Sequence, residues 1–350
     1  MNSYIFNSKL SLKKLFLYWI IFLSVGEIIV RIDKKYNFSI LKDDIKIGEN
    51  FEKAYEWNDF PKNFAPETNQ KRIMIIGDSH IHGIGFHASK RFSTILLDSL
   101  KKVQPDSIKP IILDLSRTGS NLIDNYLIFN EFEKKFKPHK ILWFHNLADV
   151  MEDDHDLHIY QKEILGHLYT NKRNTTINRL KSDSVKTIKN IEKSYKKRHV
   201  EFYKKSENIS ELMNYLKYNI YNKLLSFGIL IPTTKMHHVF KYAYLENSQE
   251  FNRFKVIFNS LISEVRSESD FIFYLMPRFN IIHREDYFKL SENALKRYFA
   301  TKERFIFLNG RLDFHNIKSN KLTIIHTDSH PNAFAHKIIL NKNFDLFGTN

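Results

Sequence analysis

The sequence contains no cysteine, which excludes disulfide bonds, thiolate metal sites and a cysteine nucleophile. Glycine is scarce, with 10 residues in 350, while Lys and Phe are abundant, and this pattern indicates a compositional bias. Zinc-finger spacing, glycine-rich aromatic strand motifs and basic heptad regions are also missing. We therefore attribute the net charge of +15 to the compositional bias and predict no nucleic-acid partner.

The chain does have enough apolar material for a large folded core. Hydrophobic side chains make up 43% of the sequence and aromatic ones 14%, which excludes wholesale disorder. A chain of 350 residues can bury one large core, or a core together with an inserted subdomain.

An apolar run near the N-terminus resembles an export signal. It extends from Leu15 to Val30 and follows Lys13 and Lys14. We predict that residues 1–35 form an uncleaved signal anchor that crosses the cell membrane once. Because the lysines precede the run, the rest of the chain is expected on the extracytoplasmic side. A cleaved signal peptide and a core helix of the folded domain are the alternatives.

The remaining chain alternates short apolar runs with amphipathic segments. Strands are predicted at 72–76, 110–115, 141–144, 270–276 and 304–308, and helices at 89–103, 121–136, 284–300 and 332–341. This alternation is typical of βαβ units and predicts a doubly wound parallel sheet.

The alternation is interrupted in the middle of the chain. Residues 36–70 are predicted to be a linker, and residues 151–265 an α-helical insertion, rich in lysine. The domain is therefore expected in two parts, 71–150 and 266–350. We predict a flavodoxin-like, three-layer α/β/α fold that carries the α-helical insertion.

Polar residues follow several of the predicted strands, where ligands bind in open α/β sheets. Ser79 follows the first strand, Gly119 the second and Asn146 the third, while His330 stands just before the last helix. A serine hydroxyl becomes a nucleophile when an imidazole accepts its proton and a carboxylate fixes the tautomer of that imidazole. Ser79, His330 and Asp328 can supply these three groups.

The same stretches contain donors for a developing negative charge. The backbone N–H groups of Ser79 and Gly119 and the side-chain amide of Asn146 form a candidate oxyanion hole. Taken singly, each residue has an ordinary structural role: Ser79 as a helix N-cap, Gly119 in a turn with positive φ, and His330 at the surface. His82, His87, His326 and His336 are interpreted as ordinary surface histidines. The joint occurrence of the four blocks in order favours function.

These blocks resemble those of the SGNH (GDSL-type) hydrolases, which are named for a Ser, a Gly, an Asn and a His. Gly77-Asp78-Ser79 resembles the first block, Gly119 and Asn146 the next two, and Asp328-Ser329-His330-Pro331-Asn332 the last. The resemblance covers roughly residues 70–150 and 268–345. It implies a serine esterase with Ser79, His330 and Asp328 as the catalytic residues, acting without a metal or other cofactor.

Three positions depart from the family pattern. Asp328 stands two residues before His330, whereas the acid of the family pattern more usually stands three before. Leu147 replaces the usual acidic residue after Asn146, with Asp149 coming later. His80 follows the nucleophile where many members carry an apolar or aromatic residue, and it either lines the pocket or faces the helix.

The predicted reaction is hydrolysis of a carboxylic ester on a small molecule or a glycan, for example an O-acetyl group on an envelope glycan. Three alternatives stay open: an O-acyltransferase with the same triad, a non-catalytic membrane-tethered binding protein, and a metallophosphoesterase. The last is suggested by the Asp-x-His pattern of Asp78 and His80, although its later ligand motifs are missing. The segment Glu152–His158 is either a metal site or a solvated loop.

Overall fold

The computed structural model describes residues 12–36, 69–84, 87–105, 107–150, 189–193, 243–324 and 329–348. Most of the predicted linker and much of the predicted insertion lie outside these residues. So do Asp328, His326 and the segment Glu152–His158.

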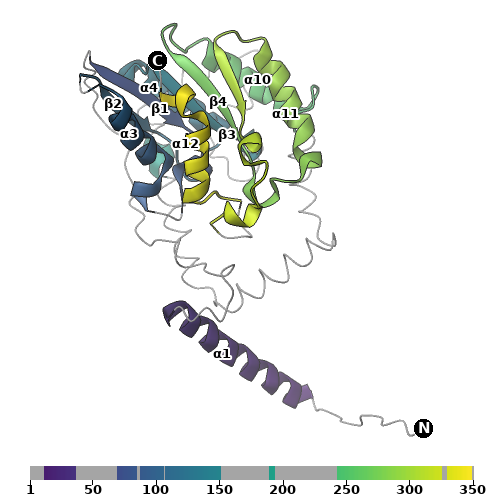
Figure 1. Ribbon diagram of the computed structural model, residues 1–350. Helices are drawn as coiled ribbons and strands as arrows, with labels where there is room; N and C mark the ends of the chain where they lie inside the picture. Colours follow the sequence, from purple (N-terminus) through teal and green to yellow (C-terminus); the bar gives the residue numbers. More distant parts are fainter. Residues whose placement is uncertain are drawn as a thin grey trace.

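Five parallel strands form one sheet in the order β2-β1-β3-β4-β5 (Figure 1). Their bounds are Gln70–Ile76 for β1, Lys109–Asp114 for β2, Lys140–Asn146 for β3, Asp270–Met276 for β4 and Phe305–Asn309 for β5. This is the flavodoxin-like strand order, so the predicted fold class is confirmed. The order reverses between β1 and β3, which pair in parallel through Ile75 and Leu142.

The strands are apolar on both sides because helices cover both faces of the sheet. In β1, Ile73 and Ile75 point into one core, and Met74 and Ile76 point into the other. All seven residues of β3 are buried, as expected for the central strand.

Two helical layers flank the sheet (Figure 1). One face carries α3 (Phe92–Val103) and α12 (Ala333–Gly348). The other carries α4 (Leu122–Phe136), α10 (Gln249–Ile262) and α11 (Glu285–Ala300). The structure therefore has the three layers that the alternation of strands and helices predicts.

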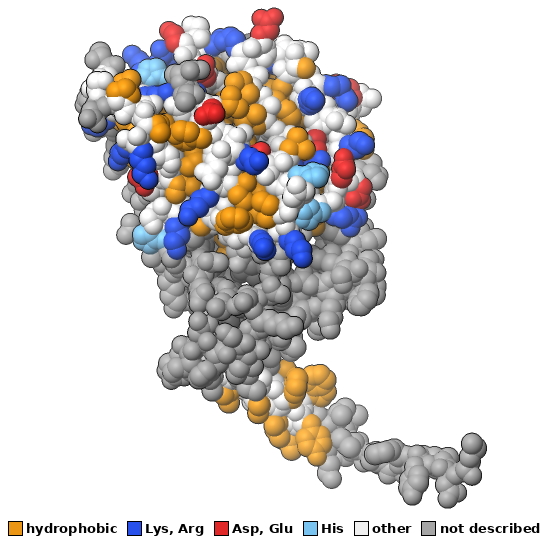
Figure 2. All heavy atoms as spheres, viewed as in Figure 1, with side chains coloured by type: hydrophobic (Ala, Val, Ile, Leu, Met, Phe, Trp, Pro, Cys, Tyr) orange, Lys and Arg blue, Asp and Glu red, His pale blue; other side chains and the backbone are white. Residues whose placement is uncertain are grey.

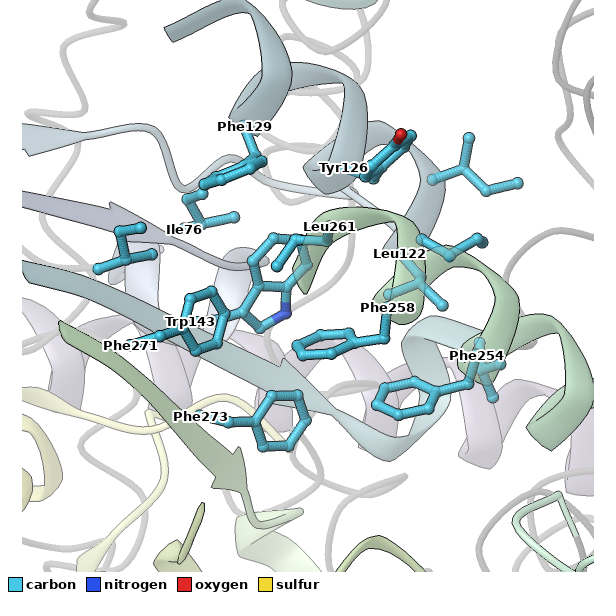
Figure 3. Close-up of a cluster of buried hydrophobic side chains, with 14 of the residues drawn as sticks. Ile76, Leu122, Tyr126, Phe129, Trp143, Phe254, Phe258, Leu261, Phe271 and Phe273 are labelled. Atoms are coloured by element: carbon cyan, nitrogen blue, oxygen red, sulfur yellow. The ribbon is translucent and has the colours of Figure 1, made fainter. Parts of the chain in front are cut away.

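Aromatic rings fill much of the core between β3, β4 and α10 (Figure 3). The Trp143 ring packs edge-on against Phe258, with 5.5 Å between the ring centroids. Phe258 stacks on Phe254 at 4.9 Å and meets the edge of Phe273 at 5.2 Å. Such pairs add about 0.5–1.5 kcal/mol each beyond the burial of their area. Because α10 supplies two of these rings, it belongs to the three-layer domain although it lies within residues 151–265.

Ser248 is the N-cap residue of α10. Its side-chain oxygen accepts a hydrogen bond from the Phe251 backbone N–H at 3.1 Å. Ser248→Ala should lower the free energy of unfolding by about 1 kcal/mol, because that N–H loses its acceptor. Urea denaturation followed by circular dichroism measures the change. Ser267→Ala, at an exposed loop position, is the control, and equal stability of the two variants would refute the capping role.

The N-terminal apolar segment forms α1 (Leu12–Tyr36). Large hydrophobic side chains on α1 are exposed between Phe16 and Ile28, as Figure 2 shows. Among the described residues, no helix combines the length and the apolar character that crossing a membrane requires.

Candidate active site

Ser79 lies directly beyond the carboxyl end of β1. It is the first residue of a short helix, α2 (Ser79–His82), whose N-cap is Asp78 rather than Ser79. An Asp78 side-chain oxygen accepts the His80 backbone N–H at 2.9 Å. The helix ends at Gly83, which adopts a left-handed conformation with φ of 74°. The Ser79 hydroxyl is therefore not used for capping.

Gly77 allows the chain to turn toward Ser79 in close contact with β3. A Cβ atom at this position would lie 2.5 Å from Ile81 Cγ2 and 2.9 Å from the carbonyl oxygen of Phe144. No larger residue fits there without displacing backbone. The glycine thus places the start of α2 against the central strand.

The structure brings Ser79 and His330 together across 251 residues of sequence. Ser79 Oγ lies 2.7 Å from His330 Nε2, and Ser79 is 8% exposed. The loop that carries His330 is held by backbone hydrogen bonds, from Ile324 N–H to the His330 carbonyl and from Asn332 N–H to the Leu322 carbonyl. The contact has the geometry of a hydroxyl nucleophile beside its base.

Asn146 ends β3 on the other side of the point where the strand order reverses. Its backbone N–H donates to Asp149 Oδ2 at 3.0 Å, and its Oδ1 accepts the Ala148 backbone N–H at 2.9 Å. The second bond identifies the oxygen of the amide, so the NH₂ group points the opposite way, toward the His80 ring. Asp149 therefore supports Asn146 from three residues further along the chain. In the family pattern, the acidic residue directly follows the Asn.

Gly119 lies in the turn after β2, at a φ of 77° that favours glycine. This turn is tied to the loop between β1 and α2, because the Gly77 carbonyl accepts hydrogen bonds from Arg117 N–H at 3.2 Å and from Ser120 Oγ at 2.8 Å. The turn that contains Gly119 is therefore hydrogen-bonded to Gly77, which stands two residues before Ser79. Asp328, the predicted acid, lies outside the described residues.

Asp78 is a buried carboxylate within this site. Burial raises its pKa, but the interaction with the His80 ring, two hydrogen bonds from His80 and, to a smaller extent, the nearby His330 outweigh burial. The pKa of Asp78 is therefore lowered. The site holds an ionised carboxylate beside both histidines.

Two histidines interpreted as surface residues are buried, so that prediction is wrong for His82 and His336. His336 Nδ1 accepts the Phe92 backbone N–H at 3.1 Å, and Nε2 donates to the His80 carbonyl at 2.8 Å. Burial lowers the pKa of His336 to about 4, which keeps the ring neutral. The helical spacing of His336 with Ile339 and Leu340 is the sequence signal that could have placed it on the buried face of α12.

No family model matches the chain, and no curated protein matches it. Three solved structures are similar to it at low identity. The α/β hydrolase LAE5 from the metagenome of Lake Arreo, Spain, has a TM-score of 0.39 and 12% identity over 79% of this chain and 94% of its own. The lipase Lip_vut3 from a goat rumen metagenome has a TM-score of 0.39 and 10% identity, over 79% and 98%. A catalytic mutant of Axe2, an acetylxylan esterase from Geobacillus stearothermophilus, has a TM-score of 0.37 and 10% identity, over 80% and 95%.

The described residues contain no group of three or more His, Asp or Glu side chains placed to hold a metal ion. The Asp78 and His80 side chains of the Asp-x-His pattern hydrogen-bond to each other, with 2.8 Å between Oδ2 and Nδ1.

Another buried histidine, His145, lies in β3 next to Asn146. Its Nε2 lies 2.6 Å from the Tyr244 hydroxyl, and burial lowers its pKa to about 3. Because the unfolded chain binds this proton with a pKa near 6.5, acidification favours unfolding. The free energy of unfolding should therefore rise with pH from about 3 and level off above about 6.5.

His145→Phe tests this linkage, because it removes the titrating ring and keeps an aromatic side chain beside Phe254 and Phe273. The variant's stability should depend less steeply on pH, by about 1.4 kcal/mol per pH unit between about pH 4.5 and 5.5. Urea titrations at several pH values measure both slopes. Parallel curves for the two proteins would show that His145 is not held neutral.

Proposed function

We propose that the protein is a serine esterase of the SGNH type that acts through an acyl-Ser79 intermediate. The observation that carries the proposal is the 2.7 Å contact between Ser79 Oγ and His330 Nε2 at the carboxyl edge of a parallel sheet. Support also comes from Asn146, whose NH₂ group is oriented on the same edge, and from the Gly119 turn tied to Gly77.

In the proposed mechanism, Ser79 Oγ attacks the ester carbonyl carbon while His330 Nε2 accepts the hydroxyl proton. The carbonyl oxygen becomes an oxyanion that accepts hydrogen bonds from the N–H groups of Ser79 and Gly119 and from the Asn146 amide. Collapse breaks the ester bond, and His330 returns the proton to the leaving alcohol. Water then attacks acyl-Ser79 with His330 as base, which releases the acid and restores the hydroxyl. We assign the orientation of His330 to Asp328.

The proposed substrate is an O-acyl ester, such as an O-acetyl group on an envelope glycan. The support for this class is the resemblance of the four blocks together with the export signal that the N-terminal run predicts.

Hydrolysis of p-nitrophenyl acetate by the purified full chain tests the reaction type. We expect release of p-nitrophenol that is unchanged by EDTA, and no hydrolysis of bis(p-nitrophenyl) phosphate, because the proposed steps use no metal. Activity on the phosphodiester that EDTA abolishes would favour the metallophosphoesterase instead. Release of p-nitrophenol that requires an added sugar acceptor would favour acyl transfer, since a hydrolase completes its turnover with water alone.

We further propose that the chain is attached to the cell membrane through its N-terminal segment, with the esterase domain on the extracytoplasmic side. Support comes from the lysines that precede the apolar run and from the exposed side chains of α1, including Phe16 at 67% and Trp19 at 55%. Fractionation of cells followed by protease treatment of spheroplasts tests this location. Recovery of the full-length chain in the soluble fraction would refute it.

A further inference from the structure

The imidazole ring of His80 contacts two groups of the proposed catalytic machinery at once. It stacks on the His330 ring, with 4.6 Å between the centroids and 25° between the planes. The Asn146 Nδ2 atom lies 3.2 Å from His80 Nε2 and 3.5 Å from Nδ1. Since both ring nitrogens are at similar distances, the amide lies toward the face of the ring rather than along one lone pair.

The His80 ring is itself held from several sides. Its Nδ1 lies 2.8 Å from Asp78 Oδ2, and its backbone N–H donates to the other oxygen of the same carboxylate. Its carbonyl accepts the Nε2–H of the buried His336 at 2.8 Å. With 6% of its surface exposed, His80 has little freedom to move.

The hydrogen bond to Asp78 fixes the orientation of the His80 ring. An ionised carboxylate can only accept hydrogen bonds, so His80 Nδ1 carries a hydrogen and donates to Asp78 Oδ2. Held in this way, the ring contacts the Asn146 amide and the His330 ring at the same time.

We propose that His80 is a positioning residue, which sets the distance and orientation of the oxyanion donor Asn146 relative to the base His330. The inference rests on the proposed esterase function and adds a role for a position that the four sequence blocks leave unassigned. His80 itself exchanges no proton with the substrate in this scheme. Its effect on the reaction passes through Asn146 and His330.

A double-mutant cycle in the full chain tests this role, with p-nitrophenyl acetate as the probe substrate. His80→Ala should lower kcat about 10-fold and change KM by less than about twofold, because only the placement of transition-state groups is lost. In the Asn146→Ala background, His80→Ala should lower kcat by less than about threefold, since one of the groups that it positions is already gone. His283→Ala, at an exposed histidine, is the matched control.

Thermal melting of each variant identifies the folded ones, and His80→Gln replaces His80→Ala in the cycle if the alanine variant fails to fold. A His80 variant with wild-type kcat would overturn the inference. So would a double variant whose fold-loss in kcat equals the product of the two single losses, because the two residues would then act independently. These two outcomes count against the inference when the wild type hydrolyses the ester and Ser79→Ala does not. Failure of the proposed function is distinct, because the wild type would then not hydrolyse the ester, or Ser79→Ala would hydrolyse it equally well.

Discussion

Replacing Ser79 with alanine should lower kcat/KM for p-nitrophenyl acetate by at least about 10³-fold. The reason is that Ser79 Oγ, 2.7 Å from His330 Nε2, is the only oxygen in the proposed scheme that forms the acyl intermediate. His330→Ala should have an effect of similar size, and the two losses should not multiply, because the hydroxyl and the imidazole act as one unit.

Ser267→Ala provides the matched control for this experiment, since Ser267 lies in an exposed loop. Melting curves of the variants confirm that the fold is retained. Retention of more than about a tenth of the activity by folded Ser79→Ala would contradict the mechanism, since background catalysis without a nucleophile is far weaker.

Asn146→Ala should lower kcat by about 10²–10³-fold, equivalent to about 3 kcal/mol of transition-state stabilisation. The Asn146 side-chain oxygen accepts the Ala148 N–H, and the Asn146 backbone N–H donates to Asp149, so the NH₂ group is in place before the negative charge develops. Asn146→Asp should lose as much activity, because the carboxylate has the same shape but no hydrogens to donate. KM should change little, since the donor acts mainly on the oxyanion.

Asn252→Ala, at an exposed position of α10, serves as the control for an asparagine substitution. Steady-state kinetics at several substrate concentrations separate kcat from KM. If Asn146→Ala keeps kcat within about threefold of the wild type, Asn146 does not contribute to the oxyanion hole.

The sheet could be predicted from the sequence because buried parallel strands need continuous apolar runs. The run at Ile141-Leu142-Trp143-Phe144 predicted β3, although pairing with β4 extends this strand to Lys140–Asn146. The end of α12 could not be predicted in the same way. The helix continues beyond residue 341 to Gly348, where Phe347 packs against Phe92 and Phe144. Tertiary contacts of this kind leave no mark in the local pattern.

The proximity of the site residues was predictable only as a consequence of topology. Polar residues that follow the strands were expected beyond the carboxyl ends of the sheet. The structure places β1 and β3 side by side, at the point where the strand order reverses. The support of Asn146 by Asp149, and the place of His80 between Asn146 and His330, depend on side-chain orientations that no spacing rule gives. The Asp-x-His pattern of Asp78 and His80 left a metallophosphoesterase open as an alternative in the sequence, and in the structure the two side chains hydrogen-bond to each other.

Reaction with a fluorophosphonate, followed by intact-mass measurement, tests the central claim most directly. The full chain should gain the mass of one phosphonyl group, and folded Ser79→Ala and His330→Ala should gain none, because labelling needs both the hydroxyl and its base. The absence of an adduct on the folded wild type, or an adduct that persists in Ser79→Ala, would contradict the assignment of Ser79 as an activated nucleophile.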